Sequence, residues 1–228
     1  MTDHAHDLAS VRDATERLLT AVTELDDAAV TEPSRLPGWS RGHVLAHLAR
    51  NADALANVLR GLPMYVSGEA RDADIERDAP RALDLQLADV RDSAAGFQEA
   101  AAAPADWSRT VELRNGVTDT AARVPFRRWA EVELHHVDLG IGYELEDLPA
   151  EFTEREIGFL AERFAGRPEV PPTRLTDGTR TWRTGRETDG PGVTVTGSPA
   201  DLLGWLAGRR DGSGLTVGGG PLPALPPL

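Results

Sequence analysis

Apolar residues in the first 140 positions recur at the spacing of a helix face. In residues 7–30 they follow one another at three- and four-residue steps, which places them on one side of an α-helix. These positions are Leu8, Val11, Leu18, Leu19, Val22 and Leu25. A helix with one apolar face must bury that face against another element. The pattern therefore predicts a long amphipathic helix in a packed helical domain.

Three further segments have the length of bundle helices. Ser40 follows a loop rich in proline and is well placed to cap a helix over residues 40–61. A third helix, with a thinner apolar stripe, is predicted over 80–103. A fourth begins at Pro125, a residue favoured in the first turn, and ends near Gly140. Four helices of this length predict a four-helix bundle.

The composition changes near residue 166. More than half of the 22 glycines and 16 prolines lie between this point and the C-terminus. Residue types that alternate with a period of two predict short strands in three segments of this part, namely 179–185, 192–197 and 215–220. A helix capped by Ser198 is predicted over 198–208. This part of the chain is therefore expected to form a small α/β module.

The predicted fold class is α+β. An N-terminal four-helix bundle is expected over residues 1–148 and a small C-terminal α/β domain over residues 149–228. The proline-rich end, residues 221–228, is expected to be extended on the surface or disordered.

Charge and hydropathy narrow the classes of partner. The chain has 228 residues, of which 40% are hydrophobic, enough for one large core or a core with a small satellite domain. Its formal net charge of -13 argues against nucleic-acid and membrane-surface partners. No apolar run approaches the roughly 20 residues that span a bilayer, and the N-terminus is too polar for a signal peptide. We expect a cytoplasmic protein, a monomer or weak dimer, with small-molecule or protein partners.

The sequence contains no cysteine, and all 24 basic residues are arginines. A disulfide framework, a thiolate metal site, an iron-sulfur cluster and a cysteine nucleophile are therefore excluded. Any thiol chemistry has to use a thiol from outside the chain. The lack of lysine and the abundance of alanine indicate a GC-rich genome, such as that of an actinobacterium.

Apart from two near the N-terminus, the histidines form pairs on predicted helices: His43 with His47, and His135 with His136. At about 100° per residue, His47 lies at the edge of the apolar face of its helix and His43 lies toward solvent. A single histidine at such an edge is more often a hydrogen-bonded core residue than a metal ligand. Both interpretations of His47 stay open from this helix alone.

Three ionisable side chains share one strip of the fourth predicted helix: Glu131, His135 and Asp138. Glu131 and His135 could offer an oxygen and a nitrogen to one metal ion, and His47 could complete a three-ligand site with an open position. The alternative is a solvated face on which Arg127 and Arg128 pair with Glu131. The spacing leaves both interpretations open.

Two segments resemble the signature segments of the mycothiol-dependent maleylpyruvate isomerases: GWSRGHVLAHLARNAD and RRWAEVELHHVDLGIGYELEDLP. A third, GVTVTGSPADLLGWLAGRRDG, is similar to their small C-terminal domain. This family belongs to the helical-bundle superfamily of damage-inducible and thiol-transferase proteins. The resemblance implies a divalent metal, with Zn²⁺ the expected ion, bound by His47, Glu131 and His135.

The resemblance also implies a reaction, the cis-trans isomerisation of maleylpyruvate to fumarylpyruvate with mycothiol as cofactor. A metal-bound thiol is held as thiolate near neutral pH. The thiolate adds to the double bond, the resulting single bond rotates, and elimination returns the thiol. One alternative is a mycothiol S-transferase of the same fold, which would release the adduct. The other is a non-enzymatic metal-dependent binding module, in which Asp138 or His43 would fill a fourth ligand position.

The two carboxylates of such a substrate call for a positive partner, and arginine binds carboxylates bidentately. Arg209 and Arg210 follow the helix predicted in the C-terminal domain. We expect one of them to reach across an interdomain cleft to a substrate carboxylate. The alternative is that both are ordinary solvated arginines at a helix C-terminus.

Residues 38–42, GWSRG, match the pattern of a nucleophile elbow. That motif needs a buried strand before the serine, and here the preceding residues are PSRLP. Ser40 is therefore predicted to be a helix cap rather than a nucleophile.

Overall fold

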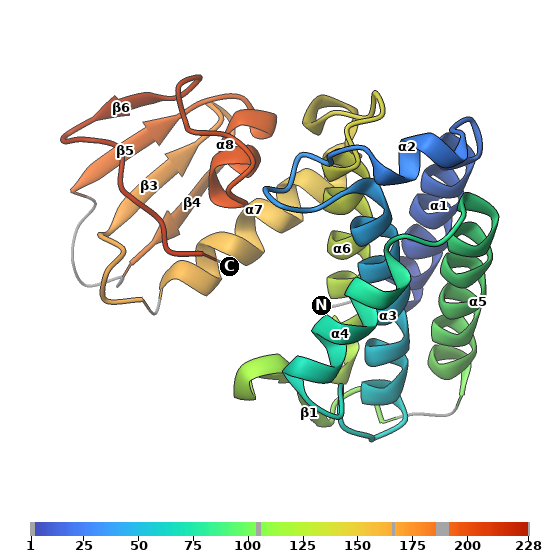
Figure 1. Ribbon diagram of the computed structural model, residues 1–228. Coiled ribbons are helices and arrows are strands. Elements are labelled where there is room, and N and C mark those ends of the chain that lie inside the picture. The colour runs from blue at the N-terminus through green and yellow to red at the C-terminus, as the bar shows by residue number, and fades with distance from the viewer. Residues whose placement is uncertain (1–2, 104–105, 166, 186–191, 228) are drawn as a thin grey trace. The chain divides into compact units, whose positions relative to one another are not determined.

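The computed structural model describes residues 3–103, 106–165, 167–185 and 192–227. The chain divides into two compact units, Met1–Tyr143 and Glu144–Leu228 (Figure 1). The first unit is helical with a small hairpin, and the second combines helices with a four-stranded sheet. The predicted α+β fold class is confirmed. The sequence-based domain boundary lies at residue 148, a few residues beyond the division between the two units.

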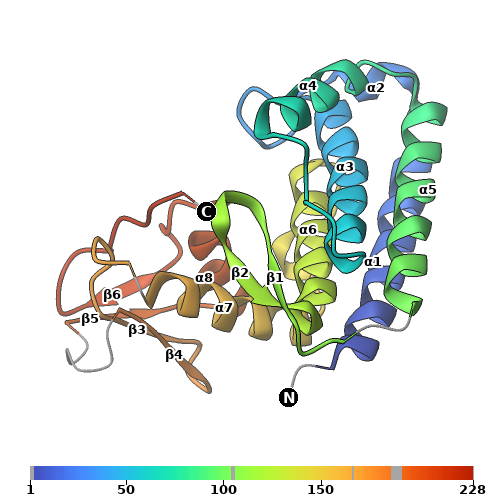
Figure 2. The same ribbon diagram turned by 90° about the horizontal axis from the view of Figure 1, so that it is seen from below.

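Six α-helices are described in the first unit. They are α1 (His4–Thr23), α2 (Asp27–Thr31), α3 (Arg41–Leu59), α4 (Gly68–Asp78), α5 (Leu83–Ala102) and α6 (Val124–Asp138). Figure 2 shows α1, α3, α5 and α6 side by side, and each of these four corresponds to a predicted helix. Contacts join α3 to α5, α5 to α1, α1 to α6 and α6 to α3, so the four helices close a bundle.

Side chains at the helix starts fix several boundaries. The first predicted helix is too long, because Asp26 accepts a hydrogen bond from the Ala29 backbone and starts α2. Ser40 caps α3: its hydroxyl accepts from the His43 backbone, and its own backbone N–H donates to the His43 ring. The assignment of Ser40 as a helix cap is confirmed. A proline stands in the first turn of α6, as predicted.

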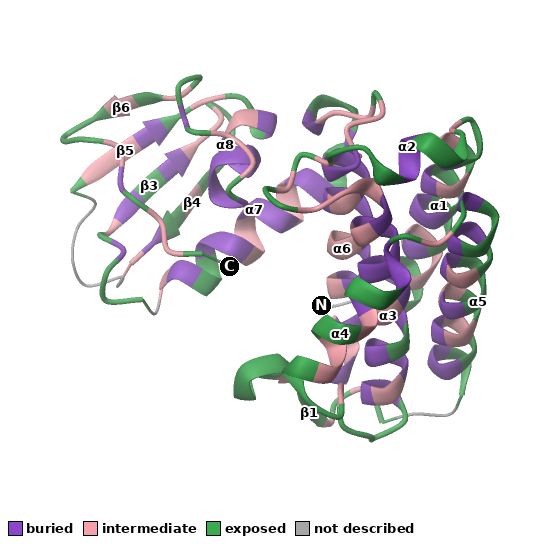
Figure 3. Ribbon diagram, in the orientation of Figure 1, coloured by how far each residue is buried: buried purple, intermediate pink, exposed green. Residues whose placement is uncertain are grey.

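The helix α3 lies at the centre of the bundle. Of its 19 residues, 14 are buried, and Figure 3 shows it purple along most of its length. It contacts α2, α4, α5 and α6. Small side chains permit the close approach of these helices, and the buried alanines of α3 are Ala46, Ala49, Ala52, Ala54 and Ala56.

The helix α4 is absent from the sequence-based prediction. Its sequence, GEARDADIERD, has no apolar stripe, and only Ile75 and Asp78 are buried. The Asp78 carboxylate is fully buried and contacts Arg50 at 2.8 Å, Arg77 at 2.9 Å and also Arg81. Charge pairing at the C-terminal end of α4 therefore attaches this helix to α3, and hydrophobic periodicity could not detect it.

The segment between α5 and α6 contains a β-hairpin, which the sequence-based prediction also lacks. Strands β1 (Thr110–Glu112) and β2 (Thr118–Thr120) pair antiparallel, with Val111 opposite Asp119. Asn115 and Gly116 in the turn have φ of 60° and 71°, the left-handed conformation that these two residue types adopt most readily.

The second unit contains α7 (Ala150–Ala165), α8 (Pro199–Leu206) and the strands β3 (Thr173–Thr176), β4 (Thr181–Thr184), β5 (Val193–Thr196) and β6 (Thr216–Gly218). The strand order is β4-β3-β5-β6; β3 and β5 are parallel, and the other two pairs are antiparallel. The helix α7 packs against β4 and α8. The core of the second unit includes Phe152, Ile157, Leu160, Leu175, Val195 and Leu202.

Predicted and observed elements agree in part here. The predicted strands β4, β5 and β6 and the helix α8 with its Ser198 cap are present. The helix α7 and the strand β3 are not in the sequence-based prediction. Residues 221–227 form neither helix nor strand, and Leu228 lies outside the described residues. Within the described ranges, each helix is too short or too polar to cross a membrane.

A matched pair of glycines tests the packing of α3. A Cβ on Gly42 would lie 2.0 Å from the Ala79 carbonyl oxygen and 2.8 Å from Cγ1 of Val30, whereas a Cβ on Gly96 in α5 meets nothing within 4 Å. We expect Gly42→Ala to lower the free energy of unfolding by about 3 kcal/mol or more. Gly96→Ala should raise it by about 0.5 to 1 kcal/mol through higher helix propensity. Urea denaturation measures both, and equal effects would contradict the described packing.

Candidate metal centre

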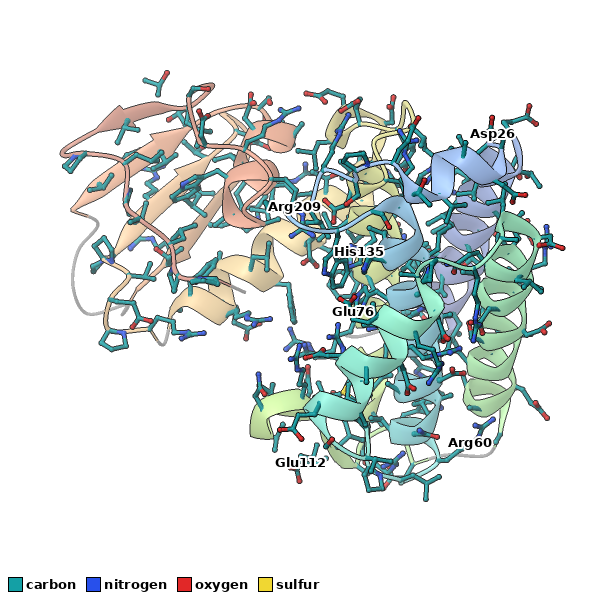
Figure 4. All side chains as sticks on the ribbon, in the orientation of Figure 1. Asp26, Arg60, Glu76, Glu112, His135 and Arg209 are labelled. Atoms are coloured by element: carbon teal, nitrogen blue, oxygen red, sulfur yellow. The ribbon has the colours of Figure 1, made fainter. Side chains whose placement is uncertain are left out.

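His47 of α3 meets Glu131 and His135 of α6. Nε2 of His47 lies 3.0 Å from Oε2 of Glu131, and Nε2 of His135 lies 3.3 Å from the same oxygen. The side chains of His47 and His135 are 8% and 12% exposed, whereas that of Glu131 is 34% exposed. Figure 4 labels His135 on α6. The three potential ligand atoms lie within 4.8 Å of one another, and solvent reaches them on the Glu131 side.

The other ring nitrogen of each histidine has a partner of its own. Nδ1 of His47 is 2.9 Å from Nη2 of Arg71, which comes from α4. Nδ1 of His135 is 2.9 Å from Oδ2 of Asp138, a fully buried carboxylate one turn further along α6. The ring of Trp39 packs on His47 with 5.6 Å between centroids. Both imidazole rings are therefore held from two sides.

The environment sets the charge of each group. Burial opposes ionisation of Glu131, but hydrogen bonds with His135 and His47 outweigh it and hold the pKa of this carboxyl well below its usual value. Burial also opposes protonation of His135, yet the carboxylates of Asp138 and Glu131 raise the pKa of this imidazole. Burial, with the nearby charge of His135, lowers the pKa of His47 to about 4. Near neutral pH, His47 is therefore neutral and Glu131 is ionised.

Two imidazole nitrogens and one carboxylate oxygen form a donor set that suits Zn²⁺ and leaves a coordination position open. The Asp138 carboxylate lies 2.9 Å from Nδ1 of His135 and can hold the orientation of this ring, as carboxylates commonly do at histidine-metal sites. The two residues considered as a fourth ligand, Asp138 and His43, have other partners. Asp138 contacts His135, and His43 contacts Ser40 and, at 3.4 Å, Glu76. Among the described residues, the cluster thus has the three donors of an open site.

The alternative of a solvated arginine face is wrong for Arg128. Its side chain is 1% exposed, and its Nη1 donates to the Leu48 carbonyl at 2.9 Å and to Asn51 Oδ1 at 2.8 Å. Arg127 donates to Asp119 at 2.6 Å. Because α6 packs against α3, the strip that carries Glu131 faces α3, although the Glu131 side chain stays 34% exposed.

The two arginines predicted as substrate anchors lie in the second unit. Nη1 and Nη2 of Arg210 contact Asp201 at 2.8 Å and Glu146 at 2.7 Å. Nη1 of Arg209 donates to the Ala207 carbonyl at 2.7 Å, and Figure 4 labels this side chain. Their role toward a substrate stays a prediction.

Arg71 is a site residue that sequence reasoning missed. It belongs to α4, which has no apolar period, and it contacts a histidine 24 positions away. Its guanidinium also lies 5.9 Å from the ring centroid of Tyr65. Tyr65 lines a cavity of about 630 Å³ between the end of α3 and the β1 hairpin. The candidate metal centre therefore has a polar neighbourhood that extends toward this cavity.

Comparisons with known proteins agree with this arrangement. The family model described as the mycothiol maleylpyruvate isomerase N-terminal domain matches residues 11–140, and that of the MDMPI C-terminal domain matches residues 147–227. The chain belongs to the mycothiol maleylpyruvate isomerase family. No curated protein matches the chain significantly.

Two solved structures are similar to this member of the mycothiol maleylpyruvate isomerase family. The crystal structure of the mycothiol-dependent maleylpyruvate isomerase has 28% sequence identity and a TM-score of 0.88. The crystal structure of a histidine-to-alanine mutant of that enzyme has 27% identity and the same TM-score. Each match covers 99% of this chain and 97% of the other chain. The likeness therefore extends over both units.

The low pKa of His47 predicts a pH effect on stability in metal-free protein. The unfolded chain takes up a proton at His47 near pH 6.5, whereas the folded chain does so only near pH 4. The free energy of unfolding should therefore fall as the pH is lowered through this window, by up to about 3 kcal/mol from His47. In EDTA, the His47→Gln variant should lack this pH-dependent contribution to the free energy of unfolding. Identical pH profiles of urea denaturation for both proteins would contradict the buried, neutral His47.

Proposed function

We propose that this chain is a metal- and mycothiol-dependent isomerase that converts maleylpyruvate to fumarylpyruvate. The main support is the convergence of His47, Glu131 and His135 in a partly open cluster. The proposal is also supported by the names of the similar solved structures, which have this fold over their whole length. A non-enzymatic binding module is less well supported, because a structural site needs a fourth protein ligand.

His47, Glu131 and His135 would hold a divalent metal, with Zn²⁺ the expected ion. When bound, such a metal supplies Lewis acidity that favours the thiolate form of mycothiol near neutral pH. The chain's own residues fix the donor atoms. The Asp138 carboxylate, 2.9 Å from Nδ1, would orient the His135 ring, and the buried packing of α3 fixes the position of His47.

The reaction needs a nucleophile that adds and then leaves. Because the chain has no cysteine, mycothiol has to supply it. Its sulfur would form a bond to one carbon of the cis double bond, and a proton would be taken up at the substrate. Rotation about the new single bond, loss of that proton and cleavage of the carbon-sulfur bond then give the trans product and free thiol. Neither oxidant nor reductant is required, since the thiol is regenerated.

The substrate is a dianion and the protein has a formal net charge of -13, so local positive charge is needed. We propose that Arg209 or Arg210 meets one carboxylate. Arg71 provides another guanidinium, in direct contact with His47.

The ligand assignment predicts the metal content of matched histidine variants. His47→Ala should lose at least about tenfold in Zn²⁺ affinity, because a ligand is removed from a three-donor site. His43→Ala is the matched control one turn earlier on α3, and it should retain the metal. Elemental analysis after dialysis against a limiting Zn²⁺ concentration measures both. Undiminished metal in His47→Ala would exclude this residue as a ligand.

The proposed reaction predicts thiol-dependent turnover without thiol consumption. Zn²⁺-loaded protein, mycothiol and maleylpyruvate should give fumarylpyruvate at a constant mycothiol concentration. Omission of mycothiol should abolish turnover, and Glu131→Gln should lower it about a hundredfold by weakening the metal site. Absorbance can follow the substrate while a thiol reagent measures mycothiol in timed samples. One-for-one loss of thiol would instead identify an S-transferase, and turnover without thiol would contradict both reactions.

A further inference from the structure

The two histidines of the candidate centre differ in the chemistry of their second partners. His135 Nδ1 faces the carboxylate of Asp138, which can only accept when ionised. His47 Nδ1 faces Nη2 of Arg71 at 2.9 Å. A guanidinium has donors and no acceptor. His47 Nδ1 therefore has to accept from Arg71 through its lone pair.

This contact fixes the position of the proton on the neutral His47 ring. With its lone pair on Nδ1 occupied by Arg71, the ring carries its proton on Nε2. Nε2 then donates to Oε2 of Glu131 over 3.0 Å. The same nitrogen is the one that points into the three-donor cluster. The hydrogen bond from Arg71 thus selects the tautomer in which this nitrogen has no free lone pair.

A cation at the cluster requires the opposite tautomer. Nε2 has to offer its lone pair, so the proton of the neutral ring has to be on Nδ1. Two N–H donors would then face each other across the 2.9 Å between Arg71 and His47. At His135 no such conflict arises, since Nδ1 lies 2.9 Å from the Asp138 carboxylate, a group that can accept from Nδ1–H. The conflict is confined to Arg71.

We propose that the hydrogen bond from Arg71 to His47 and a divalent cation at the cluster exclude each other, and that cation binding frees Arg71 to bind a carboxylate. The inference rests on the metal site of the proposed function. Arg71 is then a positioning residue in the metal-free protein and an anion-binding residue in the loaded protein.

The surroundings of Arg71 allow its side chain to move while α4 stays attached. Arg71 lies in the first turns of this helix, after the Ser67 cap. Its other charged contact is Asp72, whose side chain is 61% exposed. The attachment of α4 lies at its opposite end, where Asp78 is buried among arginines. The Arg71 side chain is only 10% exposed, so a swing of its guanidinium breaks its contacts with His47 and Tyr65, but it leaves the Asp78 contacts intact.

The same surroundings favour a carboxylate as the partner of the freed side chain. A guanidinium binds a carboxylate through two parallel hydrogen bonds, which a neutral ligand does not match. Tyr65, whose ring lies 5.9 Å from Arg71, lines the cavity of about 630 Å³. Arg71 thus contacts a residue of the cluster and lies beside a residue that lines a space large enough for a small organic acid.

Nitrogen-detected NMR of the histidine rings tests the exclusion directly. In EDTA, His47 should show the tautomer protonated at Nε2, and in saturating Zn²⁺ the tautomer protonated at Nδ1. The spectrum of His47→Gln identifies the His47 signals by their absence. A loaded protein in which His47 keeps its proton on Nε2 would overturn the proposal while leaving Zn²⁺ binding, and hence the metal site, intact. Failure of Zn²⁺ to bind would overturn both.

Titration calorimetry with matched arginine variants tests the two roles of Arg71. Arg71→Gln should bind Zn²⁺ about tenfold more tightly than the unaltered protein, because the competing donor is gone. With Zn²⁺ bound, it should bind maleate, used as the carboxylate probe, about tenfold more weakly. Arg77→Gln makes the same charge change on the same helix, with Asp74 and Asp78 as partners, and should leave both affinities within about twofold. Equal behaviour of the two variants would overturn the proposal.

Discussion

Because α3 is covered by α2, α4, α5 and α6, each polar side chain on its buried surface needs a partner inside the protein. Asn51 accepts from the buried Arg128, and His47 lies between Glu131 and Arg71. Small residues of α3 allow its neighbours to approach closely enough for these contacts. The candidate metal centre is therefore a consequence of packing around one central helix.

The two histidines of the cluster share one carboxylate partner, yet their pKa values shift in opposite directions. Both Nε2 atoms point at the same oxygen of Glu131, and both rings are largely buried. At His47, burial and the nearby charge of His135 dominate, whereas at His135 the carboxylates of Asp138 and Glu131 outweigh burial. The pKa of His135 is raised and that of His47 is lowered. Burial and the neighbouring charges of each ring thus decide how protons are distributed between the two histidines.

The elements that could be predicted from the sequence are those that pack through a periodic apolar face. The four bundle helices carry such a face, and the spacing of Glu131 and His135 on one of them, together with the family resemblance, indicated the cluster with His47. Periodicity could not reveal α4, since a buried carboxylate among arginines attaches it to the bundle. Arg71 was missed for the same reason. Its contact with His47 joins residues 24 positions apart through tertiary packing.

The attachment of α4 has a consequence for local stability. This helix buries only Ile75 and Asp78, whereas α3 buries 14 of its 19 residues. Segments with little buried apolar surface open at a lower free energy than the core. Amide protons in α4 should therefore exchange with solvent through openings of this helix alone, and those of α3 through unfolding of the whole bundle. High salt should weaken the contacts at the partly exposed arginines and make these openings more frequent. One side of the candidate centre would thus belong to the slowest-exchanging part of the protein, and the other to a helix whose opening responds to ionic strength.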